Sequence, residues 1–419
     1  MYAQKFQNAI KKYPLFSKQD VKKLGEFLKD KLSKDSGFQV FNRFVNSPIR
    51  PSKKLLDHVG DMINKQQVFN LIDDQIAAYN AIMYRANRQS KQHEKSVIIV
   101  KGGLGTGKSV IALEVMGELM RKGKTVFHAT GSSAFTKTLR KLVGKRAEKF
   151  YKFFFNFTKL KENEINVLIC DEAHRIRKTS NDDEHQIVRP NEIWNVELIK
   201  NAAKKLEVSE SNIFEFELKT QFRCSGSDTY LQWLENILDI RESDIQTLTK
   251  ATGMEFKIFD SPHELKKAIE QKNKEKGNSA RIVAGFCWPW SEPRPDGSLV
   301  NDVKIGDFEM PWENKKEAWT WATNESGMDQ VGTVYTAQGF EFDYIGVIFS
   351  NDLVYDKKQK KWISKPENSQ DSVVKRGNKN LTEHLKNVYR VLMSRAHKGV
   401  YVYFMDKDTK EFFKSKIQS

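Results

Sequence analysis

The pattern of hydrophobic and polar positions divides the chain into a helical part and two parts in which strands and helices alternate. Residues 1–93 carry apolar side chains at helical spacing, as in the segment 19–32, and show no cluster of catalytic residue types. From about residue 96 to 225 short apolar segments alternate with helical stretches, and a second alternating region begins near residue 255. Such alternation predicts an α/β fold of two parallel-sheet domains with helices on both faces, preceded by a helical N-terminal region.

The predicted domains are a helical region at 1–93, a first α/β domain at 94–225, a helical connector at 226–254 and a second α/β domain at 255–419. The strands expected in the first domain are 96–100, 125–130, 166–171 and 214–218. Those expected in the second are 255–259, 281–287, 332–337, 344–350 and 400–404, with a helix at 381–396.

Two polar insertions interrupt the second domain, at residues 288–330 and 351–380. The first holds five of the eight tryptophans and a hairpin signal at Asp296 and Gly297, and the second has a probable hairpin at 353–364. The aromatic and lysine side chains could stack bases and neutralise phosphates. The favoured interpretation is that the tryptophans fill a small core under a long loop.

A glycine-rich segment follows the first expected strand and precedes a helix. Residues 102–109 read GGLGTGKS, which is the spacing of a phosphate-binding loop. Glycines let backbone N–H groups turn toward phosphates, and the following helix adds the positive end of its dipole. Lys108 would bring a positive charge to the β- and γ-phosphates of ATP, and the Ser109 hydroxyl would bind the accompanying Mg²⁺. The residues expected to bind the nucleotide are Gly102, Gly103, Gly105, Thr106, Gly107, Lys108 and Ser109.

Two carboxylates stand at the end of the expected strand 166–171, where ligands of open parallel sheets collect. Asp171 is expected to bind Mg²⁺, directly or through water. Glu172 is expected to orient and deprotonate the water that attacks the γ-phosphate. Arg223 and Arg395 are candidates for contacts with the terminal phosphate as its charge redistributes. The alternatives are a capping role for the carboxylates and surface ion pairs for the arginines.

The charge and the cysteines of the chain indicate the class of binding partner and the cellular compartment. Lys and Arg total 70 against 54 for Asp and Glu, and this excess favours an anionic partner such as nucleic acid over an acidic protein. The alternative is a generically basic protein, whose charge indicates no particular partner. Three cysteines without CxxC spacing argue against disulfides and structural zinc, and they fit a reducing cytosol. No apolar run approaches the roughly 20 residues that span a bilayer, so a soluble, cytoplasmic protein without membrane association is expected.

Five segments, in this order along the chain, resemble the motifs of superfamily 1 helicases. The residues within them are similar to the Schlafen group 3-like DNA/RNA helicase domain family. The segments are GGLGTGKS, DEAHR, LKTQFRC, VGTVYTAQGFEFDYIGVIF and NVYRVLMSRA, and the resemblance covers roughly residues 48–405. It implies two RecA-like domains that hydrolyse Mg²⁺-ATP between them and bind single-stranded nucleic acid, DNA being favoured over RNA. Longer family members carry a nuclease-like domain that residues 1–93 do not match, so a nuclease is an expected partner.

The resemblance also implies roles for individual residues. Gln75 resembles the glutamine that recognises adenine, the alternative being a surface glutamine of a helix. Arg223 and Arg395 match the arginines that contact the γ-phosphate. Gly339 and Glu341 match positions near the sugar, where Glu341 would accept a ribose hydroxyl. Ser and Thr that end a strand are also ordinary turn formers. The expected contacts with nucleic acid are Thr130, Gly131, Ser132 and Thr336.

One motif departs from the family pattern. Gln186 best matches the glutamine that senses the γ-phosphate, yet only eleven residues separate it from His174. A return to a neighbouring parallel strand takes a dozen or more residues, so the first sheet is expected to lack one strand. The preferred function is an ATP-dependent motor on nucleic acid. The shortened segment favours an alternative, a switch that closes on ATP and recruits a partner without translocating. A catalytically inactive scaffold conflicts with the set Lys108, Asp171 and Glu172.

Overall fold

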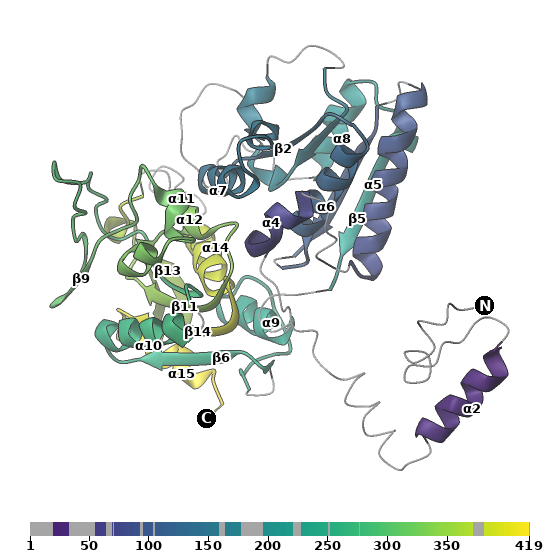
Figure 1. Cartoon of the computed structure of the whole chain (residues 1–419). Coiled ribbons are helices and arrows are strands. Elements are labelled where there is room, and N and C mark those ends of the chain that lie inside the picture. Colours follow the sequence, from purple (N-terminus) through teal and green to yellow (C-terminus); the bar gives the residue numbers. More distant parts are fainter. Residues whose placement is uncertain are drawn as a thin grey trace, which may run out of the picture. The chain divides into compact units, whose positions relative to one another are not determined.

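The computed structural model divides the chain into two compact units, Met1–Ile49 and Arg50–Ser419. Of the first unit it describes the helix α2 (Val21–Leu32) and the residue before it (Figure 1). The described residues are 20–32, 55–63, 69, 71–92, 95–103, 105–158, 164–176, 196–220, 228–249, 252–275, 277–371 and 381–418.

The first strand-rich region contains two groups of parallel strands. β1 pairs with β5, and β2 lies between β3 and β4. Four of these strands were expected, and β3 was not, because three residues are too few to show an alternating pattern. In chain order the main elements are α4 (Leu55–Ile63), α5 (Asp73–Gln92), β1 (Val97–Gly102), α6 (Lys108–Arg121), β2 (Val126–Thr130), α7 (Ser133–Val143), β3 (Tyr151–Phe153), η4 (Phe154–Phe157), β4 (Val167–Cys170), η5 (Ala173–Arg175), α8 (Val196–Lys205) and β5 (Ile213–Leu218).

The helices α4 and α5 share a hydrophobic core with α6 and β2. Met62 of α4 and Ala78 of α5 lie in the same buried cluster as Leu113 and Met116 of α6. The Arg121 guanidinium also donates to the Met62 carbonyl oxygen, at 3.1 Å. The helices α4 and α5, predicted as part of a separate helical region, therefore pack into the first strand-rich region. The predicted domain boundaries stay predictions.

The second strand-rich region is built on one five-stranded parallel sheet. Its strand order is β10-β7-β11-β14-β6, which confirms the predicted α/β class. In chain order the main elements are α9 (Asp228–Ile237), β6 (Glu255–Phe259), α10 (Pro262–Glu275), β7 (Ala280–Ala284), β8 (Val303–Ile305), β9 (Phe308–Met310), α11 (Ala318–Trp321), β10 (Val331–Gly332), α12 (Val334–Ala337), β11 (Phe342–Phe349), β12 (Leu353–Asp356), β13 (Lys361–Ser364), α14 (Leu381–Met393), β14 (Ala396–Phe404) and α15 (Lys407–Ser415).

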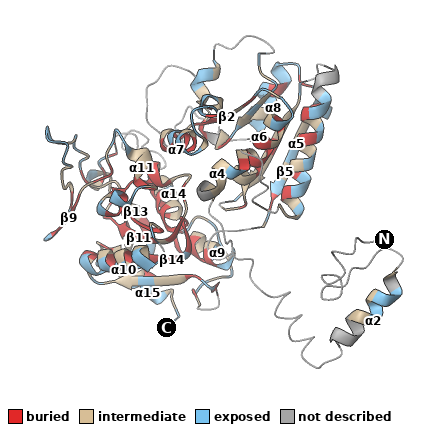
Figure 2. Cartoon of the chain, viewed as in Figure 1, coloured by how far each residue is buried: buried red, intermediate tan, exposed pale blue. Residues whose placement is uncertain are grey.

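Both faces of this sheet are covered, as the alternation along β11 shows. Ile345 and Val347 belong to the cluster that contains residues of α9, α14 and α15. Ile348 belongs to the opposite cluster, with Ile269 of α10. Figure 2 shows β11 and β14 as largely buried strands. Such near-continuous burial explains why both strands read as apolar runs in the sequence.

Two predicted elements of the second region are wrong in part. The segment 332–337, expected as a strand, is the last residue of β10 followed by the short helix α12. The physical reason is that the backbone N–H of Thr333 bonds to the Glu313 carboxylate instead of a neighbouring strand. The helix expected at 381–396 ends at Met393, since Ala396 already pairs with Phe342 of β11.

The insertion at 288–330 packs its tryptophans into a core, which confirms the favoured interpretation. Trp288, Trp312 and Trp321 are buried, and the Trp290 indole N–H donates to the Glu313 carbonyl oxygen at 2.9 Å. Asp296 and Gly297 form a tight turn, but the paired strands in this insertion are β8 and β9. The expected hairpin at 353–364 is present as β12 and β13.

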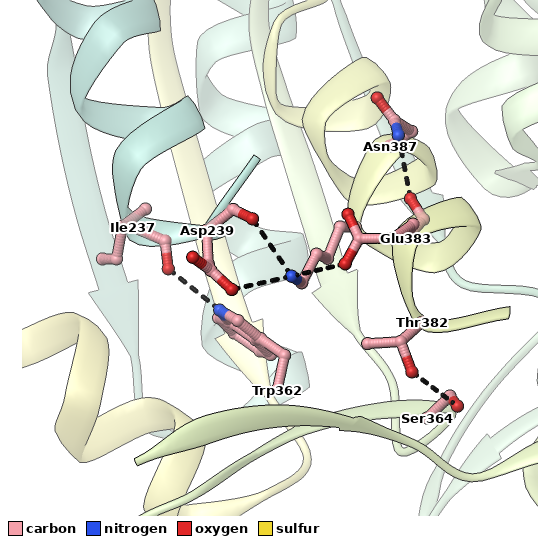
Figure 3. Close-up of polar contacts among 8 residues, drawn as sticks. Ile237, Asp239, Trp362, Ser364, Thr382, Glu383 and Asn387 are labelled. Carbon is pink, nitrogen blue, oxygen red and sulfur yellow. Dashed lines mark hydrogen bonds and ion pairs between the residues drawn. The ribbon is translucent and has the colours of Figure 1, made fainter. Parts of the chain in front are cut away.

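A buried lysine joins α9 to α14. The Lys386 side chain is 4% exposed, and its ammonium group donates to the Asp239 carbonyl oxygen and carboxylate at 3.0 and 2.9 Å and to Glu383 at 2.8 Å. Figure 3 shows Asp239 after the end of α9 facing Glu383 on α14. Beside them the Trp362 indole N–H donates to the Ile237 carbonyl oxygen. These bonds fix the helix that leads to Arg395.

Candidate nucleotide and nucleic-acid site

The predicted phosphate loop lies between β1 and α6. Gly105 and Gly107 have left-handed φ angles of 75° and 85°, which favour glycine. The Lys108 ammonium group donates to the carbonyl oxygens of Gly102 and Gly103, at 2.8 and 2.7 Å. Among the described residues no side chain caps the first turn of α6, so its first backbone N–H groups can donate to an anion. The loop thus combines the donors and the cation that a phosphate group requires.

Gln75 is buried against this loop. Its side-chain amide donates to the Thr106 carbonyl oxygen at 2.9 Å and accepts from the Ile72 backbone N–H at 3.3 Å. A Cβ atom at Gly107 would collide with the same amide, a second reason for glycine there. Gln75 therefore connects the start of α5 to the phosphate loop. Its expected contact with adenine stays a prediction.

Asp171 follows β4 directly and lies beside the phosphate loop. Its backbone N–H donates to the Ala129 carbonyl oxygen at 2.9 Å, and its Oδ2 atom lies 3.5 Å from Nε2 of His128. Burial alone would raise the pKa of Asp171, but His128, the Ser109 hydroxyl and the charge of Lys108 hold that pKa below its usual range. The structure therefore brings Lys108, Ser109 and Asp171 together, with the carboxylate ionised.

The Asp171 and Ser109 side chains fit the predicted metal role. The Asp171 Oδ2 atom is buried, and its 3.5 Å contact with His128 Nε2 does not have the geometry of a hydrogen bond. A buried carboxylate oxygen of this kind calls for a cation or a water molecule. Carboxylate and hydroxyl oxygens are the ligands that Mg²⁺ prefers.

Glu172 has a strained backbone. Its φ angle is 53°, in the left-handed region that residues with a Cβ atom seldom adopt, and its N–H donates to Asp171 Oδ1 at 3.0 Å. Such strain costs about 1–3 kcal/mol and gathers at functional sites, where the surroundings impose it. The turn places Glu172 immediately before η5, which contains His174 and Arg175. Its role as the base stays a prediction.

Arg395 lies in the connection between α14 and β14, not on the helix as expected. Its side chain is 3% exposed, and the guanidinium Nε donates to the Val391 carbonyl oxygen at 3.0 Å. Its backbone carbonyl oxygen accepts from Phe342 of β11, at 3.0 Å. The arginine is therefore fixed at the end of the second sheet, and its contact with a phosphate stays a prediction.

Gly339 and Glu341 lie between α12 and β11. Gly339 has a φ of 92°, and a Cβ atom there would come within 3.1 Å of the Phe135 ring of α7. Glu341 lies 3.2 Å from Nε2 of His397 on β14. Glycine is thus needed at 339 for conformation and space, and Glu341 already has a partner whose importance the sequence did not reveal. The predicted contacts with the sugar remain untested.

The Thr336 hydroxyl is bonded to a carboxylate, Glu313, that no sequence motif indicated. This hydroxyl donates to Glu313 Oε1 at 2.6 Å, and the Thr333 hydroxyl donates to the same oxygen at 2.8 Å. Glu313 is fully buried, and burial raises its pKa to about 6. Glu313 lies some twenty residues before α12 in the sequence, so no short motif could have indicated its contact with that helix. The contact of Thr336 with nucleic acid stays a prediction.

The segment 130–132 forms the start of α7. Ser132 caps the helix by accepting from the Phe135 N–H at 3.3 Å, and the Thr130 hydroxyl accepts from the Ser132 N–H at 3.2 Å. Both side chains are buried, while Gly131 lies against Arg175 and Phe154. These are the contacts of a turn, the alternative that the sequence left open. The contacts of Thr130, Gly131 and Ser132 with nucleic acid are not tested by them.

Contacts within the unit 50–419 join the two strand-rich regions. The Thr138 hydroxyl of α7 donates to the Trp319 carbonyl oxygen of α11 at 3.0 Å, and the rings of Phe135 and Phe340 meet edge to face at 6.3 Å. Two predicted catalytic residues, Arg223 and Gln186, lie outside the described residues. The proposed convergence of the arginines on one triphosphate therefore stays a prediction.

Parallel α/β sheets with a phosphate loop ahead of paired carboxylates define the class of P-loop proteins. Residues 95–183 and 182–406 match the Schlafen group 3, DNA/RNA helicase domain family, and the chain belongs to that family. Membership makes the protein helicase-like and relates it to proteins that act on nucleic acid.

Two individual proteins are similar to this chain. An uncharacterized protein of Saccharomyces cerevisiae is 24% identical, over 75% of this chain and 83% of the relative. The crystal structure of Pif1 helicase from Candida albicans is similar with a TM-score of 0.34 and 13% identity, over 83% of this chain and 100% of that chain. In the described part of the chain, no helix combines the length and hydrophobicity that a membrane crossing requires.

Proposed function

We propose that the protein is an ATP-dependent motor that moves along single-stranded nucleic acid. The observation that carries the proposal is the assembly of Lys108, Ser109 and Asp171 at a glycine-rich loop, in a chain of a helicase family. The buried Asp171 is ionised beside the charge of Lys108, whose ammonium group donates to the loop carbonyl oxygens of Gly102 and Gly103. A triphosphate would give both groups a common ligand.

The residues of the loop would bind the terminal phosphates. Lys108 would exchange the Gly102 and Gly103 carbonyl oxygens for phosphate oxygens, and the first N–H groups of α6 would donate to the same anion. Ser109 and Asp171 would ligate Mg²⁺, which supplies positive charge against the phosphate oxygens. Glu172 would accept the proton of the attacking water. Arg395 and Arg223 would stabilise the charge that develops on the γ-phosphate.

The test is the ATPase rate of the full chain with single- and double-stranded DNA and RNA at two salt concentrations. A motor should hydrolyse faster when single strands are present, and the stimulation should weaken as salt displaces phosphate contacts. Lys108→Ala should abolish turnover. The matched control is Lys101→Ala, a lysine seven residues earlier that pairs with Glu215 and lies outside the loop. Equal activity in both variants would remove the loop from catalysis.

A second function is favoured by the short stretch between His174 and Gln186. If that stretch lacks the element that couples hydrolysis to movement, the protein would be a switch that closes on ATP and binds nucleic acid or a partner without stepping. Displacement of streptavidin from a biotinylated strand separates the two functions. A motor removes streptavidin in an ATP-dependent manner, whereas a switch hydrolyses ATP and leaves it bound.

A further inference from the structure

An exposed aromatic pair stands at the end of the edge strand β3. The Phe155 side chain, 66% exposed, lies parallel to the Phe153 ring, with centroids 5.4 Å apart and an angle of 10° between the planes. The Arg140 guanidinium lies 5.3 Å from the Phe153 centroid on the same assembly. The outer face of the Phe155 ring is therefore in water, where a flat aromatic ligand can reach it.

The backbone that carries this pair is fixed by hydrogen bonds. The Phe153 N–H donates to the Asn156 side chain at 2.9 Å, and the Thr158 hydroxyl donates to the Phe155 carbonyl oxygen at 3.0 Å. Phe157, two residues on, packs edge to face against Phe127 of β2, with centroids 5.7 Å apart. The turn η4 is therefore attached to the sheet by Phe157, and Phe155 is held outward at little further entropic cost on binding.

The chain segment that leads to the pair is strongly basic. Between residues 137 and 152 the chain has seven cationic side chains and one acidic residue, Glu148. The cations are Lys137, Arg140, Lys141, Lys145, Arg146, Lys149 and Lys152, of which all but Arg140 and Lys152 are exposed. An acidic peptide would suit the charge alone, but the two stacked rings also suit a flat aromatic ligand. Nucleobases on a phosphate backbone combine both properties.

The pair also adjoins a segment already expected to meet nucleic acid. A Cβ atom at Gly131 would lie 3.5 Å from the Phe154 ring and 2.9 Å from Arg175. Gly131 directly follows β2, and β2 pairs in parallel with β3, so both carboxyl ends lie at one edge of the sheet. A strand passing over residues 130–132 would therefore run along the sheet edge at which β3 ends and η4, with Phe155, begins.

We propose that Phe155, stacked on Phe153, is a platform on which an unpaired base of single-stranded nucleic acid stacks. The proposal rests on the proposed function, because it supposes that the chain binds single strands. A duplex is not the ligand, since its bases are stacked on one another and present only their edges. Stacking on a phenyl ring reads no sequence, so this contact would serve a protein that moves along any strand.

The test is the affinity of the full chain for an oligothymidine and for an abasic strand of equal length, measured by fluorescence anisotropy. Phe155→Ala should raise the Kd for oligothymidine between about fivefold and a hundredfold. It should leave the Kd for the abasic strand unchanged, and also the slope of log K against log salt, because no phosphate contact is lost. Phe155→Trp should bind oligothymidine as well as the unchanged protein or better, whereas Phe155→Leu should behave like the alanine variant.

The matched control is Leu206→Ala, which removes an equally exposed apolar side chain (68%) beyond the end of α8 and should bind both strands normally. Unchanged binding of oligothymidine by Phe155→Ala would overturn the platform and leave the proposed function standing. An equal loss on both strands, or full affinity in Phe155→Leu, would also overturn it, since neither depends on a base or an aromatic face. Failure of the unchanged protein to bind any strand would overturn both proposals.

Discussion

Glu313→Gln is expected to remove a pH-dependent part of the stability of the second strand-rich region. The Glu313 side chain is fully buried between the Thr333 backbone N–H and the hydroxyls of Thr333 and Thr336. These hydrogen bonds favour the charged carboxylate, but burial outweighs them and raises the pKa from 4.5 to about 6. A glutamine has nearly the same shape and stays neutral at every pH.

The direction of the pH dependence follows from whether Glu313 is protonated in the folded and in the unfolded chain. Below pH 4.5 the carboxyl is protonated in the folded and the unfolded chain, so its full contribution to stability is present. As the pH rises, the unfolded chain releases the proton first, and stability falls until the folded carboxyl also ionises near pH 6. A difference of about 1.5 pKa units corresponds to a loss of about 2 kcal/mol between the two limits.

Urea unfolding at about pH 4.5 and about pH 7.5, followed by tryptophan fluorescence, measures this loss of stability. Seven of the eight tryptophans lie between residues 233 and 362, so the signal reports mainly on this region. The stability of Glu313→Gln relative to the unchanged protein should rise by about 2 kcal/mol from the lower to the higher pH. Glu309→Gln, a half-exposed residue of the same insertion, should show no such rise. An identical pH dependence in both glutamine variants would refute the reasoning.

Three other substitutions test the site and its support. Glu172→Gln should retain ATP binding and lose at least about a hundredfold in turnover, and normal hydrolysis would exclude Glu172 as the base. Arg395→Ala should slow hydrolysis with little loss of nucleotide affinity, because its contact matures in the transition state. Arg390→Ala on the preceding helix α14 is the control, and a loss of affinity with normal turnover in Arg395→Ala would contradict the assignment. Lys386→Met should lower the free energy of unfolding by about 1–2 kcal/mol in urea titrations, since buried charge-assisted bonds are lost. Lys357→Met, which breaks the exposed pair with Glu411, should change stability much less in the same assay, and equal losses would show that burial of Lys386 does not matter.

The sequence alone determined the elements whose signal is local. The apolar runs of β11 and β14 are continuous because both faces of their sheet are covered, and the alternation of apolar runs with helices specified the α/β class. The phosphate loop could be predicted because its signal is local as well. Its glycines, Lys108 and Ser109 act through the backbone of eight consecutive residues, so their spacing is preserved in the sequence.

Only the tertiary structure decided which residues far apart in the sequence come into contact. Three such contacts are those of the Glu313 carboxylate, of the phosphate loop and of the β2 edge. Glu313 turned an expected strand at 332–337 into α12, because a buried carboxylate competes with a sheet for the Thr333 N–H. Gln75 reaches the phosphate loop from a helix that the sequence placed in another region. In the same way β3 forms because its backbone pairs in parallel with β2. Its three residues are too few to show an alternating pattern in the sequence. Contacts between residues far apart in the chain depend on packing and leave no periodic trace in the sequence, which is the physical reason that they had to be seen in three dimensions.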